Sequence, residues 1–258
     1  RSATRDTDTL VTGPRPRLIP TLLLSGRGLV KGTGFADHGY IGDPINTMRI
    51  FNEKLADEVM LLDIDARREG RTPDLELVTR IADECYMPLT VGGGLSHLKD
   101  VEHLIRSGVE KVVLNTAAAD RPRLVTEVAE RFGSQSAAVA IDYRETSNGR
   151  RVVTRNGTTP YEIDPLDLAE MMVASGAGEI ILSSVDRDGS RTGLDLELIS
   201  RASQMLPVPI VALGGAGSAA DLRRAAAVGA SVAAGSLFVH FGRRRSVLIT
   251  YPLSGRDL

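Results

Sequence analysis

The chain alternates short apolar runs with longer segments in which apolar residues recur at helical spacing. The run RLIPTLLL at 17–24 is typical of a strand buried on both faces, and 97–107 has the spacing of an amphipathic helix. Such alternation predicts a parallel sheet covered by helices. The expected strands are 17–24, 58–65, 88–91, 111–114, 137–141, 179–183, 208–212 and 231–234. Helices are expected from Pro44 and at about 73–85, 97–107, 121–132, 165–175, 195–205 and 219–228.

An internal repeat fixes the architecture. Residues 61–119 recur at 182–240, with Asp65 matching Asp186 and no gap between the copies. Each copy reads strand, helix, strand, helix, strand. Two copies, with the segments before each, give about eight strand–helix units and predict an α/β (β/α)8 TIM barrel made of two half-barrels. We expect one domain over 17–258, and a disordered leader over 1–16, which is polar and rich in Pro and Gly.

Two connections stand out from the other loops. Residues 25–43 form a long glycine-rich loop that should lie over the carboxyl ends of the strands. Residues 144–161 carry Asn-Gly at 148–149 and 156–157 around an apolar core, which predicts a small β-hairpin. No element is assigned to the tail at 243–258.

Composition excludes several classes of function. The chain of 258 residues has a net charge of −2, so nothing favours nucleic acid or a membrane surface as a partner. No apolar run reaches the roughly 18 residues of a transmembrane helix. The single cysteine, Cys85, excludes an intramolecular disulfide and favours a cytoplasmic protein. Four scattered histidines make no metal-ligand spacing, so neither a metal nor a cofactor is predicted.

Glycine and polar residues gather where the predicted strands end, which is where barrel active sites lie. Gly-Gly pairs and the short polar pairs Asn115-Thr116 and Gly235-Ser236 occur in both halves, and predict two equivalent anion sites for a ligand with a phosphate at each end. The alternative is that the glycines only relieve tight turns. Asp142, the only carboxylate ending the fifth strand, is a candidate general acid or base, or else a cap or loop anchor. Asp63 and Asp186 are equally suited to capping loops.

Four charged residues stand at the opposite ends of the predicted strands. They open otherwise apolar runs, and they are Arg17, Glu58, Lys111 and Glu179. Two positive and two negative side chains could pair in a ring across the barrel floor, and such pairing would offset the cost of burying them. The alternative is four solvated strand ends.

Several stretches resemble one family over about residues 17–240. They are LVKGTGF, GDP at 42–44, TVGGG, KVVLNTAA, FGSQSAAVAID, GAGEIILSSVDRDGSRTG and GGAG, and the family is that of the cyclase subunit (HisF type) of imidazole glycerol phosphate synthase. The resemblance implies that Asp142 is one of two catalytic aspartates. It implies that the four-charge ring is a gate for ammonia from a docked glutaminase, with Glu110 as a docking residue. It also implies phosphate contacts at Lys31, Gly94, Asn115, Thr116, Asp188, Gly189, Gly215, Gly235 and Ser236.

One departure from the family pattern concerns the second catalytic aspartate. That residue ends strand 1 in the family, and here Leu23 holds the position. A leucine cannot transfer a proton, and general acid–base groups contribute about 10²–10⁴-fold to rate, so ordinary cyclase activity should be impaired.

A related branch fits this departure better, namely the HisF-like acetamidino modification group of surface-polysaccharide (O-antigen, lipopolysaccharide) synthesis. The similar stretches are IPTLLLSGRGLVKG, YIGDPINTMRIFNEK, DECYMPLTVGGG and SLFVHFGRRRSVLITYP. The resemblance implies a barrel that partners a glutaminase and channels ammonia, and that works with a sugar amidotransferase. Three alternatives remain: the histidine-pathway cyclase itself, a non-catalytic activator of a glutaminase, and the sugar-phosphate isomerase of that pathway. The isomerase needs no ammonia gate, so the charged residues weigh against it.

Overall fold

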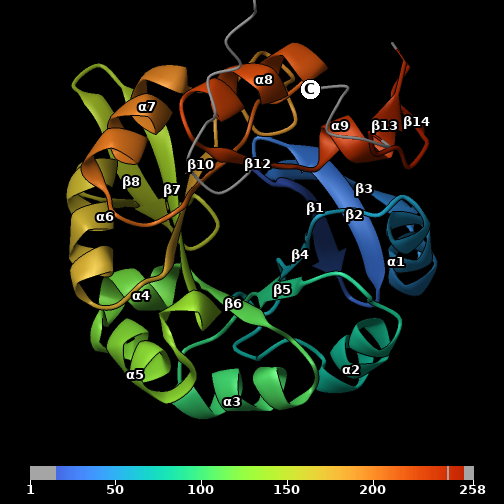
Figure 1. Ribbon diagram of the computed structural model, residues 1–258, viewed down its shortest axis with the longest axis horizontal. Helices are drawn as coiled ribbons and strands as arrows, with labels where there is room; N and C mark the ends of the chain where they lie inside the picture. Colours follow the sequence, from blue (N-terminus) through green and yellow to red (C-terminus); the bar gives the residue numbers. More distant parts are fainter. Residues whose placement is uncertain (1–15, 243, 253–258) are drawn as a thin grey trace, which may run out of the picture.

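The computed structural model describes residues 16–242 and 244–252, and these form a closed barrel of parallel strands ringed by helices (Figure 1). The barrel closes because β12 pairs with β1, and β7 pairs with β10. Its strands are β1 (Leu18–Ser25), β4 (Val59–Asp63), β5 (Leu89–Gly92), β6 (Lys111–Leu114), β7 (Ala137–Thr146), β10 (Glu179–Ser184), β11 (Ile210–Leu213) and β12 (Ser231–Ala234). The predicted (β/α)8 barrel is therefore confirmed. The leader expected at 1–16 lies, except for its last residue, outside the described residues.

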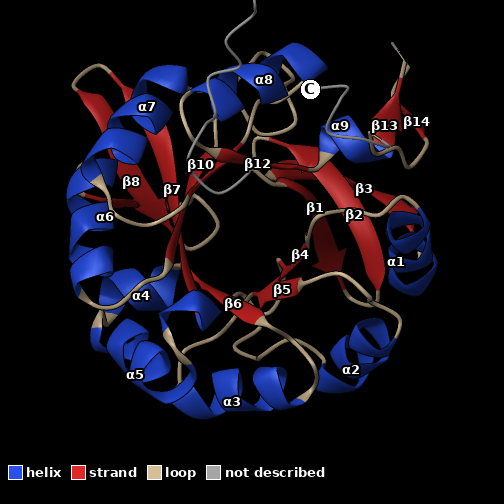
Figure 2. Ribbon diagram, in the orientation of Figure 1, coloured by secondary structure: helices blue, strands red, loops and turns tan. Residues whose placement is uncertain are grey.

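Helices cover the outside of the barrel (Figure 2). They are α1 (Pro44–Glu53), α2 (Leu75–Asp83), α3 (Leu98–Arg106), α4 (Thr116–Asp120), α5 (Arg123–Phe132), α6 (Pro165–Ala174), α7 (Leu196–Met205), α8 (Ala219–Ala227) and α9 (Ser236–Val239), with a 3₁₀ turn at Ser134–Ser136. Helix α1 begins where expected, because Pro44 suits the first turn and the Asp43 carboxylate accepts from the Asn46 amide at 2.9 Å. The short helices α4 and α9 were not predicted.

A β-hairpin follows the first strand of each half. The segment expected as a loop at 25–43 instead forms β2 (Gly28–Thr33) and β3 (Ala36–Gly42), which extend antiparallel from β1. Its turn passes through left-handed backbone at Gly34 and Phe35, with φ of 60° and 65°. The hairpin expected at 144–161 is confirmed: β8 (Gly149–Thr154) pairs with an extension of β7 and with β9 (Thr159–Tyr161).

The interior of the barrel is layered along its axis. Alternate residues of each strand point inward, and the middle layer is apolar: Ile19, Met60, Val113, Ala138, Ile181, Val211 and Ala233. Charged residues lie below this layer at the amino-terminal ends of the strands, and polar residues lie above it at the carboxyl ends. A second, larger core fills the space between the strands and the helices.

The two halves match with a one-residue shift in their last strand. Met60 and Ile181 both face inward and are 121 positions apart, whereas Val113 and Ala233 both face inward at a separation of 120. The cause is a shorter connection, because residues 107–110 join α3 to β6 and only 228–230 join α8 to β12. The gap-free repeat predicted from sequence is therefore wrong by one residue after α8. Structurally, Asn115 and Thr116 correspond to Gly235 and Ser236.

The described part of the tail returns to the barrel. After α9 come β13 (His240–Phe241) and β14 (Ser246–Val247), which pair with each other. The buried Tyr251 then packs its ring against Phe51 and Phe238. Its hydroxyl donates to the carbonyl of Leu18 at 3.1 Å and accepts from the amide of Asp57 at 3.0 Å. The tail thus fastens the start of β1 to the loop after α1.

Candidate functional site

Asp142 lies on the inner face of β7, two residues beyond Ala140 and beside Ser183 on the neighbouring β10. It is buried, and the Asn115 side-chain amide donates to its carboxylate at 3.1 Å. The pKa of Asp142 is raised to about 7, chiefly by burial and also by the charge of Asp188, while hydrogen bonds from Ser183 and Asn115 oppose the rise. A carboxyl group with this pKa exchanges a proton readily near neutral pH, as a general acid or base must.

Lys31 and Asp188 join the first hairpin to the loop that follows β10. The Lys31 ammonium donates to both oxygens of Asp188, at 2.8 and 3.1 Å, and both side chains are largely buried. The Gly34 amide donates to the Asp188 carbonyl at 3.0 Å. A Cβ on Gly189 would lie 2.4 Å from the carbonyl oxygen of Gly32, so glycine is needed for this contact. Lys31, Asp188 and Gly189, expected at a phosphate site, thus lie together at the mouth.

The Gly-Gly turns have a packing explanation. Added Cβ atoms would lie 2.1 Å from the Arg71 carbonyl oxygen at Gly94, and 2.2 Å from the Gly193 carbonyl oxygen at Gly215. Both glycines also have positive φ, of 65° and 103°. These turns therefore require glycine whether or not a ligand binds. This agrees with the alternative that the glycines relieve tight turns. Phosphate binding at these two positions remains a prediction.

The short helices α4 and α9 open directly at the mouth, after β6 and β12. No side chain caps the first turn of either helix. By contrast, α8 is capped by its own Ser218 and α3 has a capping box formed by His97 and Asp100. Asn115, just before α4, donates instead to the carbonyl of Ala140 at 2.9 Å and to Asp142.

Leu23 gives one side of the mouth an apolar surface. It lies near the end of β1, and its partner on the neighbouring strand is Leu62. Leu62 and Leu213 pack against the apolar layer inside the barrel. The residue on β4 that is paired with Leu23 is thus another leucine and not a second acid.

The four charged residues at the opposite end form a closed ring. The Arg17 guanidinium donates to both Glu58 and Glu179. The Lys111 ammonium completes the circuit at 3.2 Å from Glu58 and 2.9 Å from Glu179. Both glutamates are buried, with 1% and 4% of their surfaces exposed. The alternative of four solvated strand ends is wrong, and the use of the ring as an ammonia gate remains a prediction.

Residues beside the ring present a distinct surface. Glu110 is exposed immediately before β6, at the same end of the barrel as Lys111. Leu55 and Tyr86, in the loops that enter β4 and β5, expose 82% and 87% of their surfaces. The loop that holds Tyr86 is fixed to the end of α1, because the Tyr86 amide donates to the Asn52 side chain at 3.0 Å.

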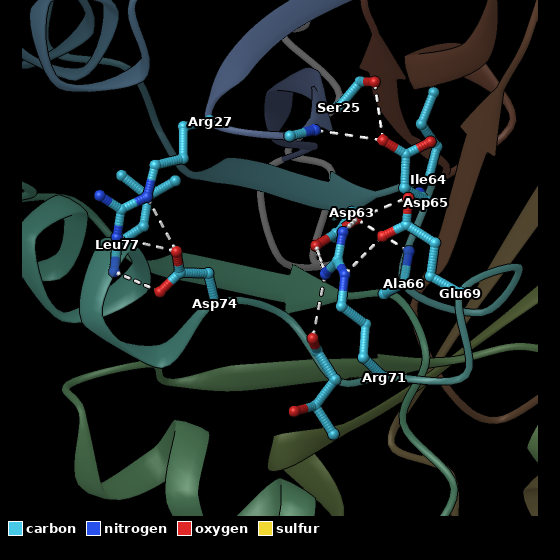
Figure 3. A network of polar contacts seen from close by, with 12 residues as sticks. Ser25, Arg27, Asp63, Ile64, Asp65, Ala66, Glu69, Arg71, Asp74 and Leu77 are labelled. Atoms are coloured by element: carbon cyan, nitrogen blue, oxygen red, sulfur yellow. Dashed lines mark hydrogen bonds and ion pairs between the residues drawn. The ribbon is translucent and has the colours of Figure 1, made fainter.

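Asp63 organises the loop that follows β4 (Figure 3). Its carboxylate accepts from the amides of Asp65 and Ala66, at 3.1 and 3.0 Å, and pairs with Arg71 at 2.6 Å. The network continues from Asp65, which accepts from the Ser25 hydroxyl at 2.7 Å. The loop-capping alternative is therefore correct for Asp63.

An arginine near the start of each hairpin pairs with an acidic helix cap of the same half-barrel. Arg27 pairs with Asp74, the cap of α2, at 2.9 Å (Figure 3). Arg150 pairs with Asp195, the cap of α7, at 2.7 Å. Sequence reasoning missed both pairs. The repeat identified the two aspartates, but no local signal connects either one to an arginine more than 40 residues away. Asp186 likewise anchors a loop, through Arg144 at 2.6 Å.

Metal and membrane chemistry find no support in the described chain. Within residues 16–242 and 244–252, no cluster of three or more His, Cys, Asp or Glu side chains could hold a metal ion. None of the helices in that part of the chain is long and apolar enough to cross a bilayer.

A closed barrel with a charged floor and a polar mouth defines a (β/α)8 barrel protein, and active sites of that fold lie at the carboxyl ends of the strands. The model of the histidine biosynthesis protein family matches residues 17–244, and the chain belongs to that family. A Pseudomonas aeruginosa protein is 47% identical over 92% of this chain and 96% of its own length. A Leptospira interrogans protein is 46% identical over 92% and 95%. Both names are provisional assignments as imidazole glycerol phosphate synthase subunit HisF. A Nocardioides protein with that name unqualified is 39% identical over 93% and 96%.

Proposed function

We propose that this chain is the ammonia-using barrel subunit of a glutaminase-dependent enzyme of the imidazole glycerol phosphate synthase type, acting in the cytoplasm. The observation that carries the proposal is the closed ring of Arg17, Glu58, Lys111 and Glu179. A structure that needed only stability would gain as much from apolar residues at these positions, because buried ion pairs often contribute no net stability. Asp142 lies at the other end of the barrel interior, beyond the apolar layer.

The surface around the ring suits a protein partner. Leu55 and Tyr86 leave large apolar areas in water, and exposed apolar and aromatic residues mark interaction surfaces. Glu110 adds a negative charge at the same end of the barrel. A glutaminase docked here would release ammonia directly at the ring, as the resemblance implies.

Chemistry at the other end follows from the two groups at the mouth. A phosphorylated ligand would contact Lys31, beside Asp188 and Gly189. Asp142, with a pKa of about 7, would accept the proton lost when ammonia attacks an electrophilic carbon of the ligand. In the first version of this function, the ligand is the substrate of the histidine-biosynthesis cyclase. The names of the relatives support this version.

A second version is supported by Leu23. With leucine in place of the second catalytic acid, the barrel would supply ammonia for the conversion of an acetamido sugar to an acetamidino sugar, with a separate sugar amidotransferase. The purified chain with ammonium salt and the cyclase substrate separates the two versions. Turnover at a normal cyclase rate supports the first, and a rate lower by about 10²-fold or more supports the second. Stimulated glutamine hydrolysis without ammonia transfer to any acceptor would instead indicate a non-catalytic activator.

A further inference from the structure

Two of the four ring residues lie within strands, and the other two lie just before them. Lys111 and Glu179 are the first residues of β6 and β10, and each has a backbone partner on a neighbouring strand. Arg17 and Glu58 instead come immediately before β1 and β4. On β1, the ladder with β4 begins only at Thr21. This ladder therefore does not reach the level at which the Arg17 guanidinium donates to Glu58.

At the start of β1, side chains satisfy the backbone groups that face β4. Pro20 has no N–H and so cannot donate to the ladder. Two residues earlier, the Leu18 amide donates to the Asp57 carboxylate at 2.9 Å, and the Leu18 carbonyl accepts from the Tyr251 hydroxyl at 3.1 Å. The Arg17 carbonyl faces the other way and accepts from an amide of β12 at 2.9 Å. Two side chains thus take the place of the missing ladder on the β4 side.

One oxygen atom links the backbone neighbours of the Arg17–Glu58 pair. The Tyr251 hydroxyl donates to the Leu18 carbonyl and accepts from the Asp57 amide at 3.0 Å. Leu18 directly follows Arg17 in the chain. Asp57 directly precedes Glu58. The hydroxyl group therefore sets the separation of the two backbone segments that carry this ion pair.

The Tyr251 side chain is itself held between two helices, and it is 8% exposed. Its ring meets the ring of Phe51, on α1, edge-on at 6.4 Å between centroids. It meets the ring of Phe238, on α9, at 5.5 Å. Aromatic pairs at such distances stabilise a structure by more than their buried area alone. Because packing restricts the ring from both sides, its hydroxyl keeps a fixed position relative to β1 and β4.

We propose that Tyr251 is a positioning residue for the charged ring, and that its hydroxyl holds Arg17 in register with Glu58. A buried ion pair offsets the cost of removing its charges from water only when its geometry is good. Glu58 is 1% exposed, so its pairing with Arg17 depends strongly on geometry. The inference deepens the proposed function by assigning control of the ring to the described part of the tail, and its link to ammonia transfer rests on that function.

Tyr251→Phe tests the positioning role, because it removes the hydroxyl and keeps the packed ring. The readout is hydrogen exchange of the Arg17 guanidinium with water, followed by nuclear magnetic resonance in the full chain labelled with ¹⁵N-arginine. The spectrum of Arg17→Lys identifies the signal. Exchange should become about fivefold faster in Tyr251→Phe, which is the equilibrium factor of one ordinary hydrogen bond.

Two further variants separate positioning from general stability. Asp57→Ala leaves the tail unchanged and removes the carboxylate that holds Leu18, so it should also speed exchange at Arg17 by about fivefold. Tyr161→Phe is the matched control, because it removes one hydroxyl-to-carbonyl hydrogen bond, of 3.3 Å, from β9. It should leave exchange at Arg17 unchanged. Unchanged exchange in Tyr251→Phe, or an equal increase in Tyr161→Phe, would overturn the inference.

A second arm tests the link to ammonia transfer, in the complex with the glutaminase and with the cyclase substrate as acceptor. The ratio of turnover driven by glutamine to turnover driven by ammonium salt should fall by about fivefold in Tyr251→Phe and stay constant in Tyr161→Phe. Faster exchange at Arg17 with an unchanged ratio would support the positioning role and contradict the use of the ring as an ammonia gate. The two proposals can therefore fail separately.

Discussion

The Asn115 side-chain amide lies 3.1 Å from a carboxylate oxygen of Asp142, at the boundary between the apolar interior of the barrel and its polar mouth. Asn115 directly follows β6 and Asp142 lies on β7, so the pairing of these two neighbouring strands fixes the separation of the two side chains. The contact stabilises the carboxylate, yet burial dominates and the pKa rises to about 7. Asp142 is consequently poised to change its protonation state near neutral pH.

Asp142→Asn should stabilise the protein above pH 7 and abolish its proton transfer. In the wild type the folded state retains the Asp142 proton between the ordinary pKa of 3.8 and about 7, so the stability from this group is lost as pH rises through that window. At pH 8 the free energy of unfolding of the variant should exceed that of the wild type by roughly 2–4 kcal/mol. At pH 5 the difference should be smaller. Denaturant titrations at both pH values measure this.

The exposed Asp167→Asn on α6 is the control for that experiment and should leave the free energy of unfolding nearly unchanged at either pH. Equal gains at pH 5 and pH 8 in Asp142→Asn would contradict the raised pKa. Ammonia transfer by the same variant should fall by about 10²–10⁴-fold.

Lys111→Met should destabilise the barrel strongly, because it leaves Glu58 and Glu179 buried with only Arg17 to balance them. Removing one member of a buried ionic network typically costs about 3–5 kcal/mol. Denaturant unfolding of this variant measures the cost. Lys99→Met, on the exposed side of α3, makes the same chemical change without that consequence. Similar unfolding midpoints for the two variants would mean that the ring contributes nothing to the fold.

Burial should separate the two arginine–cap pairs. The side chains of Arg150 and Asp195 are 19% and 3% exposed, whereas those of Arg27 and Asp74 are 55% and 33% exposed. Arg150→Ala should therefore lower the free energy of unfolding by about 2–3 kcal/mol, since it leaves a buried carboxylate unpaired. Arg27→Ala should have little effect, because water replaces its contacts. Thermal unfolding of both variants measures this difference. Equal losses of stability in the two variants would show that burial does not separate the two pairs.

Leu23→Asp tests whether the missing acid limits cyclase activity. A carboxylate at this position would stand at the mouth with Asp142, and should raise turnover of the cyclase substrate by about 10²-fold over the wild type. Leu23→Asn has nearly the same shape and cannot transfer a proton, so it should give no increase. If the asparagine variant gained as much, polarity at the mouth and not proton transfer would be responsible. Ammonia-dependent turnover with ammonium salt is the measurement.

The sequence predicted the barrel because its strands are buried on both faces and therefore read as continuous apolar runs. The same reasoning missed β2 and β3, since Ala36–Tyr40 is exposed and offers no apolar pattern, and the turn depends on left-handed backbone at Phe35. The short helix α9 was missed because four residues give no helical period. The repeat located the halves, but a one-residue shorter loop before β12 left no signal in a gap-free match.

The sequence identified individual residues of the site more reliably than the contacts between them. Each member of the charged ring opens an apolar run, which marked the four residues as candidates, but the pattern left solvated strand ends open and the family resemblance was needed to favour a ring. Asp142 could be chosen because it is the only acid ending its strand. The Thr116 hydroxyl has two hydrogen-bond partners, whereas the Ser236 hydroxyl has none among the described residues. This difference was not predictable, because one partner of Thr116 is the Arg155 amide in the β8–β9 turn, far away in the sequence. The matching residue pairs of the two halves suggested two equivalent sites, but the contacts around these pairs differ between the halves.

The central claim is that ammonia reaches the mouth through the ring of Arg17, Glu58, Lys111 and Glu179. The direct test is isotopic competition in the complex with the glutaminase, using glutamine labelled with ¹⁵N at its amide and an excess of unlabelled ammonium in solution. The account predicts that nearly all the nitrogen transferred to the acceptor carries the label. Label in proportion to the ammonium in bulk solution would show that ammonia arrives from outside, and would contradict the account.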